Sequence, residues 1–73
     1  MQKSIARDMS ITVNGERMGT SARTLAELVA ALGHDAASIA TAVNGEFVAR
    51  KAREECGLAE GDAVEIVAPR QGG

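Results

Sequence analysis

The 73-residue sequence has very few residues that cross-link, stiffen or stack: one Cys, one Pro and one aromatic residue, Phe47. A single cysteine cannot form an internal disulfide bond, so a disulfide-rich secreted mini-domain is excluded and a reducing, cytoplasmic setting is favoured. A chain this short is expected to be one domain, held together by the packing of a small core. No apolar run approaches the roughly 20 residues that a membrane-spanning helix needs, so no membrane association is predicted.

The sequence also lacks an excess of positive charge. Eight Lys and Arg residues are set against ten Asp and Glu, for a formal net charge of −2. Nucleic-acid binding depends on a clustered basic surface, and binding to single strands depends on aromatic residues, so neither is predicted. The hydrophobic share of 45% is ordinary for a folded domain.

The first Asn-Gly pair, Asn14-Gly15, predicts a β-hairpin. Apolar and polar residues alternate before it, over 9–13, and residues 16–20 would form the returning strand. A type I′ turn requires positive φ at both central residues, which Asn and Gly tolerate best.

One helix is predicted after the hairpin. Thr24 and Glu27 have the spacing of a capping box, in which their side chains satisfy free backbone N–H groups at the helix start. Gly33 would end the helix after about ten residues. The apolar residues between these signals recur at i, i+3, i+4 and i+7, as in an amphipathic helix: Leu25, Leu28, Val29 and Leu32.

The second half of the chain predicts three more strands, over 39–43, 46–48 and 63–68. A turn at Asn44-Gly45 would connect the first two, and Pro69 would end the last because proline cannot donate a ladder hydrogen bond. The element order predicts an α+β fold, in which a small mixed sheet packs on one main helix and the first and last strands lie side by side.

Segment 49–57 is charged and predicts irregular structure with one helical turn at most. The basic residues of this segment, Arg50, Lys51 and Arg53, are expected to form a solvated face.

The sequence shows no catalytic or metal-binding constellation. His34 stands alone just past the predicted helix, where a partial positive charge suits the helix dipole. Cys56 is interpreted as a small buried apolar residue rather than a reactive thiol. We therefore predict no catalytic residue, no metal site and no bound cofactor.

The printed sequence ends on Gly72-Gly73. At average glycine usage, two terminal glycines arise by chance in roughly 0.5% of chains. Glycine has no Cβ, so such an end can enter a channel that excludes other residues. Its terminal carboxylate becomes an electrophile only when another enzyme activates it, which indicates a carrier protein with its cargo at Gly73.

The order of elements and the Gly-Gly end resemble the ubiquitin-like β-grasp proteins and, among them, the ThiS family of sulfur carriers in thiamine biosynthesis. The resemblance covers residues 9–73, with 9–68 as the β-grasp domain and 69–73 as a flexible tail. It rests on the blocks ITVNG (11–15), TLAEL (24–28), AVNGE (42–46), GDAVEI (61–66) and APRQGG (68–73). Family members commonly carry proline, arginine and then an aromatic residue after the fourth strand, where this chain has Ala49-Arg50. Residues 1–8 form a polar overhang without a counterpart.

The resemblance implies a sulfur-carrier mechanism in which the protein is a cosubstrate and not an enzyme. An E1-like adenylating enzyme would use ATP to form an acyl adenylate at the Gly73 carboxylate. A sulfur donor such as a cysteine desulfurase would convert it to a thiocarboxylate, and thiazole synthase would consume the sulfur. Gly72 would give clearance, and Pro69, Arg70 and Gln71 would set the reach of the tail into partner active sites. Apolar residues on the sheet face away from the helix would dock these partners.

Three other functions stay open at this stage. The chain could serve the same chemistry as the small subunit of molybdopterin synthase, although such chains tend to be longer and richer in phenylalanine. It could be a ubiquitin-like modifier that forms an isopeptide bond through Gly73. It could also be an interaction module in which the tail has no reactive role.

Overall fold

The computed structural model describes residues 8–68, so the predicted tail at 69–73 and residues 1–7 of the predicted overhang lie outside the described range. The five strands and the α-helix occur in the predicted order, and the described residues also form two 3₁₀ helices, labelled η. The bounds of these elements are β1 Met9–Val13, β2 Glu16–Thr20, α1 Leu25–Ala31, η1 Ala36–Ser38, β3 Ala40–Val43, β4 Glu46–Val48, η2 Arg50–Glu55 and β5 Ala63–Val67. η1 was not predicted, and η2 covers six residues of the segment predicted to be irregular with one helical turn.

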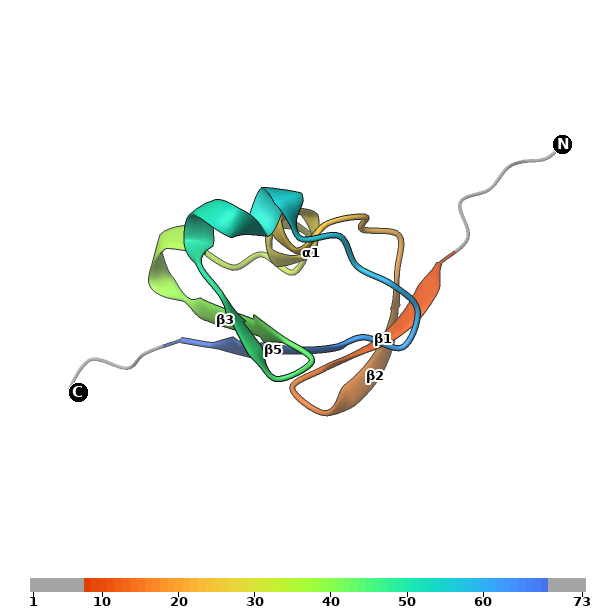
Figure 1. Ribbon diagram of the computed structural model, residues 1–73. Helices are drawn as coiled ribbons and strands as arrows, with labels where there is room; N and C mark the ends of the chain where they lie inside the picture. The colour runs from red at the N-terminus through yellow and green to blue at the C-terminus, as the bar shows by residue number, and fades with distance from the viewer. Residues whose placement is uncertain (1–7, 69–73) are drawn as a thin grey trace, which may run out of the picture.

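The five strands form one mixed sheet in the order β2-β1-β5-β3-β4. β1 and β5 are parallel and adjacent, which confirms the predicted pairing of the first and last strands, and the other pairs are antiparallel. Figure 1 shows α1 and η2 together over one face of this sheet. Among the described residues no helix is both long and apolar enough to cross a bilayer.

Both predicted Asn-Gly turns are confirmed by their backbone angles. Asn14 and Gly15 have φ of 52° and 88°, and Asn44 and Gly45 have φ of 51° and 84°. These positive values are those of type I′ turns, whose twist matches that of the flanking strands. The two hairpins therefore form where local chemistry requires them.

Helix α1 begins and ends at the predicted signals but is shorter than predicted. The Thr24 side chain accepts from the Glu27 amide at 3.1 Å, and the Glu27 carboxylate accepts from the Arg23 amide at 2.8 Å. The helix has seven residues instead of about ten, because its last turn is already closed by the amides of Gly33 and His34, which donate to the carbonyls of Ala30 and Val29. This Schellman arrangement places Gly33 at φ 81°.

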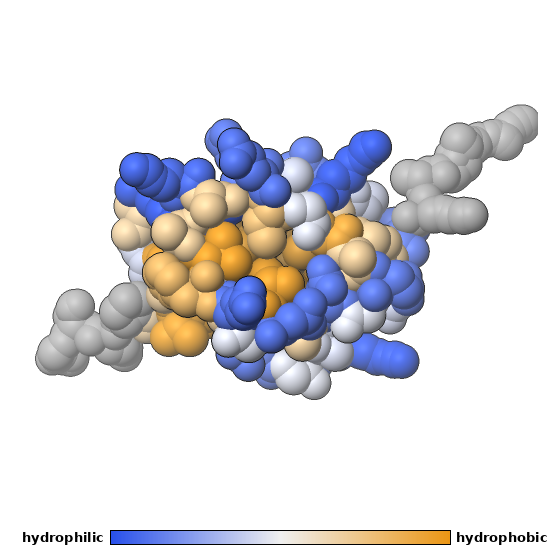
Figure 2. Space-filling model, viewed as in Figure 1, coloured by the Kyte–Doolittle hydropathy of each residue, from blue (hydrophilic) through white to orange (hydrophobic). Residues whose placement is uncertain are grey.

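The core lies between the sheet and the helical layer. On β5, the alternating residues Val64 and Ile66 face this core while Glu65 is exposed. Figure 2 shows apolar residues gathered between the two layers on one side of the molecule. The buried apolar residues are Ile11, Ala22, Leu25, Leu28, Val29, Val64 and Ile66.

Arg53 corrects the prediction that the basic residues of segment 49–57 are all solvated. Arg50 and Lys51 are exposed, but Arg53 is only 3% exposed. Its guanidinium donates to the carbonyls of Ala36 and Ile39, both at 2.9 Å, and to the Thr41 hydroxyl at 3.0 Å. η2 therefore turns one charged side chain inward, because η1, Ile39 and β3 each supply one acceptor in the fork geometry of arginine.

Asp35 is the N-cap residue of η1. The hydrogen bonds of its carboxylate contribute to the stability of the domain in a way that depends on pH. Its carboxylate accepts from the Ser38 hydroxyl and the Ala37 amide, and these bonds together with the charge of Arg50 hold its pKa below the ordinary value of 3.8. Because the folded pKa is lowered, the contribution is complete above pH 3.8 and is lost as pH falls through the folded pKa. We expect Asp35→Ala to lower the urea midpoint at neutral pH and to have a smaller effect at acidic pH, once this carboxylate is protonated in the folded protein as well. An equal effect at both pH values would contradict this role.

Candidate functional site

The candidate functional site is the end of β5 and the sheet face beside it, because the predicted reactive tail follows this strand. β5 is the central strand, with β1 on one side and β3 on the other. The parallel pairing with β1 covers Ala63 and Val64, and the antiparallel pairing with β3 reaches Val67. The chain thus enters the tail from a strand held on both sides.

The outer face of the sheet presents an apolar surface next to the end of β5. Phe47 on β4 is 72% exposed and Val67 on β5 is 57% exposed. The strand register places Phe47 opposite Ala42 and Val67 opposite Ala40, both on β3. We call these four residues the apolar sheet face. Ala40 and Ala42 are half-buried, and the exposed Glu65 lies opposite Ala42 on the same face. Exposed large apolar side chains with polar neighbours are typical of surfaces that bind another protein.

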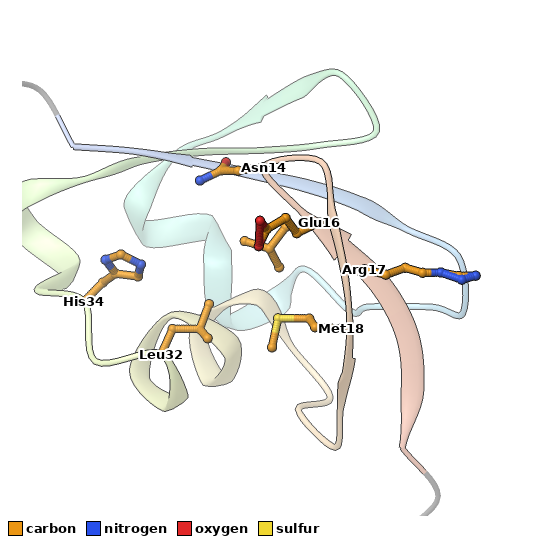
Figure 3. Close-up of a pocket in the computed structure, with 7 residues that line it drawn as sticks. Asn14, Glu16, Arg17, Met18, Leu32 and His34 are labelled. Atoms are coloured by element: carbon orange, nitrogen blue, oxygen red, sulfur yellow. The ribbon is translucent and has the colours of Figure 1, made fainter.

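His34 lies in an open groove of about 450 Å³ between the β1–β2 hairpin and the end of α1. Figure 3 shows its imidazole across the groove from the hairpin, with Leu32 and Met18 on the floor and Arg17 directed away. The position just after the helix agrees with the structural interpretation of this histidine.

Cys56 packs against the core, but it is half-buried, whereas the interpretation from the sequence has it buried. Its carbonyl accepts from the Leu25 amide at 2.8 Å, which ties the end of η2 to the start of α1. Within residues 8–68, no group of three or more His, Cys, Asp or Glu residues is placed to hold a metal ion.

Comparison with known proteins assigns the family. The model of the ThiS family matches residues 6–73, which include the Gly-Gly end. The chain belongs to the ThiS family. The crystal structure of the thiamine biosynthesis protein ThiS from Geobacter metallireducens is also similar, with 33% sequence identity and a TM-score of 0.75. That match covers 89% of this chain and 100% of the other. No curated protein matched the chain.

The ThiS family match confirms the resemblance drawn from the sequence, and the matched structure confirms the β-grasp fold. The predicted site residues Pro69, Arg70, Gln71, Gly72 and Gly73 lie outside the described residues. Sequence reasoning predicted a docking face but did not identify its residues. The register of β3, β4 and β5 places Phe47, Val67, Ala40 and Ala42 on this outer face. The only available signal was the presence of one Phe in the chain, directly after a turn.

Proposed function

We propose that this protein is the sulfur carrier of thiamine biosynthesis, with sulfur attached at the Gly73 carboxylate. The observation that carries the proposal is the ThiS family match, which extends through the Gly-Gly end. The similar structure is of a thiamine biosynthesis protein. The protein would be a substrate of its partners, so it needs no catalytic group of its own. Its proposed location is the cytoplasm, where a lone half-buried cysteine stays reduced.

The proposed chemistry has two activation steps and one transfer. A Gly73 carboxylate oxygen bonds to the α-phosphorus of ATP, bound by an E1-like adenylating enzyme, and pyrophosphate leaves. The outer sulfur of a persulfide on a donor such as a cysteine desulfurase then attacks the acyl carbon and displaces AMP, which gives an acyl disulfide. A thiol attacks the donor sulfur of this S–S bond, so a disulfide forms on the donor and the thiocarboxylate leaves. Thiazole synthase transfers this sulfur to its substrate, and an oxygen atom from the substrate or from water takes its place and restores the carboxylate. Gly72 gives backbone clearance in these active sites, and residues 69–71 span the distance from the domain.

The apolar sheet face is the proposed docking surface for these partners. This surface includes the exposed side chain of Val67, and Val67 precedes Pro69 by two residues in the sequence. A partner that covers this surface would therefore contact the chain two residues before the predicted tail begins. Burial of the exposed aromatic and aliphatic side chains supplies affinity. The carboxylate of Glu65, which lies opposite Ala42 on the same face, would meet a polar or basic group of the partner.

Intact mass spectrometry tests the proposed function. The purified chain is incubated with an E1-like adenylating enzyme of a thiamine pathway, ATP and a cysteine desulfurase with cysteine. We expect a mass gain equal to the exchange of one oxygen for sulfur, localised to Gly73 by fragmentation. An unchanged mass under conditions in which a known ThiS protein is converted would reject the proposal. Conjugates to lysine in cell lysate would favour the ubiquitin-like modifier instead.

Phe47→Ser is expected to weaken partner binding while leaving the fold intact. The side chain is 72% exposed, so the change in unfolding free energy should stay within about 0.5 kcal/mol. Loss of a central aromatic contact should raise the KM for this protein in the adenylation assay by about tenfold.

Two variants serve as controls for this prediction. Phe47→Leu retains an apolar side chain and should recover most of the affinity. Glu54→Ala changes an exposed residue of η2, in the layer on the other side of the sheet, and should leave KM unchanged. Equal KM values for Phe47→Ser and the unmodified protein would show that this face does not dock the enzyme.

A further inference from the structure

The Asn14 side chain forms two hydrogen bonds with a single residue of β5. Its Oδ1 accepts from the Ile66 amide at 2.8 Å, and its Nδ2 donates to the Ile66 carbonyl at 3.1 Å. Asn14 is the first residue after β1, and its own amide donates to the Val64 carbonyl at 2.9 Å. The Asn14 carboxamide thus makes the two hydrogen bonds to Ile66 that the backbone of β1 would make if the parallel ladder continued. Figure 3 shows Asn14 alongside β5 at the hairpin turn.

This contact lies close to the point where the chain enters the tail. β1 itself pairs with β5 only as far as Val64, whereas β3 pairs with it as far as Val67. Along the edge of β5 that faces β1, the backbone pairing stops at Val64, and the Asn14 side chain binds the next residue on that edge, Ile66. Ile66 precedes the first tail residue, Pro69, by only three positions.

We propose that Asn14 is a positioning residue for sulfur loading, which holds the end of β5 so that the tail leaves the domain in one direction. The inference rests on the proposed function. A partner that has docked on the apolar sheet face must receive the Gly73 carboxylate at its reactive atom. A fixed starting direction reduces the conformational freedom that the tail must lose at that step. Asn14 acts through Ile66 and touches no reacting atom.

The second hairpin provides a matched control for Asn14. Asn44 occupies the same position of the same turn type, with φ of 51° against 52°. Its Oδ1 accepts from the Ala63 amide at 2.9 Å, and its Nδ2 donates to the Asp62 carboxylate at 3.0 Å. Asn44 therefore holds the start of β5, at the end away from the tail. Glycine at either position keeps the positive φ and removes only the side chain.

Amide hydrogen exchange, measured by NMR on the isolated protein, tests the contact itself. In Asn14→Gly the Ile66 amide loses its acceptor, and we expect its exchange to be at least about tenfold faster than in Asn44→Gly. Asn14→Asp keeps an acceptor for the Ile66 amide but loses the donor to its carbonyl, so its rate should fall between those of Asn14→Gly and the unmodified protein. If Asn14→Gly does not fold, Asn14→Asp is compared with Asn44→Gly instead. Equal Ile66 exchange in the compared variants would overturn the contact as a restraint on β5.

Steady-state adenylation kinetics test the positioning role. For Asn14→Gly we expect kcat to fall by about tenfold with little change in KM, because the docking face is intact while fewer docked molecules present the carboxylate productively. Asn44→Gly should keep the kcat of the unmodified protein. An equal fall in kcat for both variants would overturn the positioning role. If the unmodified protein is not adenylated at all, the proposed function fails, and the exchange comparison still decides whether Asn14 restrains β5.

Discussion

Deletion of Gly72 and Gly73 should abolish sulfur loading and leave the domain folded. The deletion removes the proposed acceptor carboxylate from its position, so no acyl adenylate forms at the normal site. The described part of β5 ends at Val67, with its pairing to β1 and β3 complete before the deleted residues. We therefore expect a thermal midpoint within about 2 °C of the unmodified protein, because surface changes of about 0.5 kcal/mol or less shift it by no more than a few degrees.

Intact mass spectrometry and thermal unfolding check this prediction together. Gly72→Val is the sharper companion variant, since it keeps the Gly73 carboxylate and adds a branched side chain next to it. Loss of loading in Gly72→Val would show that clearance in the partner channel matters. Gln71→Ala changes the spacer without removing the carboxylate and should retain most of the loading. Sulfur transfer by the truncated protein would mean that Gly73 is not the carrier end.

Arg53→Met should remove a large part of the stability of the domain. The substitution removes the donor of the buried Thr41 hydroxyl and of the part-buried carbonyls of Ala36 and Ile39. An acceptor that stays buried without a partner costs about 1–3 kcal/mol. Removal of the buried charge offsets part of this loss. The net destabilisation should be about 2–4 kcal/mol, which is comparable with the 3–5 kcal/mol that one core supplies in a chain of this size.

Urea unfolding followed by circular dichroism measures the effect at Arg53. Arg53→Lys keeps the charge, but a single ammonium group cannot bridge acceptors from η1 and β3 at once, so it should also lower the midpoint. Lys51→Met makes the same substitution from a basic residue at an exposed position of η2 and should change the unfolding free energy by no more than about 0.5 kcal/mol. A midpoint for Arg53→Met equal to that of Lys51→Met would contradict the structural role of the buried guanidinium.

The local elements were predictable because their signals act within a few residues. Asn14-Gly15 and Asn44-Gly45 specify their turns through the φ values that these residues tolerate. Thr24 starts α1 through a hydrogen bond to an amide only three residues away. The length of α1 was predicted less well, because the end of a helix depends on hydrogen bonds that the apolar pattern does not show. The helix was predicted too long because the apolar stripe includes Leu32, which lies at the C-cap.

Arg53 could not be predicted as buried from the sequence. Its neighbours Arg50 and Lys51 are exposed basic residues, and nothing in the local pattern separates Arg53 from them. Its acceptors come from Ala36, Ile39 and Thr41, which lie 12 to 17 residues earlier in the chain. A buried charge is tolerated only where such partners converge, and their convergence is a property of the packed domain.

Some features of the candidate site could also be predicted from the sequence, whereas others depend on the tertiary structure. By itself the sequence determined the α+β class, the strands and turns, the family and the Gly72-Gly73 end, because periodicity, capping and turn chemistry are local and motif spacing is linear. The tertiary structure decided which side chains surround the exit of the tail. Asn14 binds Ile66 across 52 residues of chain, and Phe47 joins Val67 on one face only through the register of three strands. Contacts of this kind depend on strand pairing, which brings distant segments together only when the whole sheet forms.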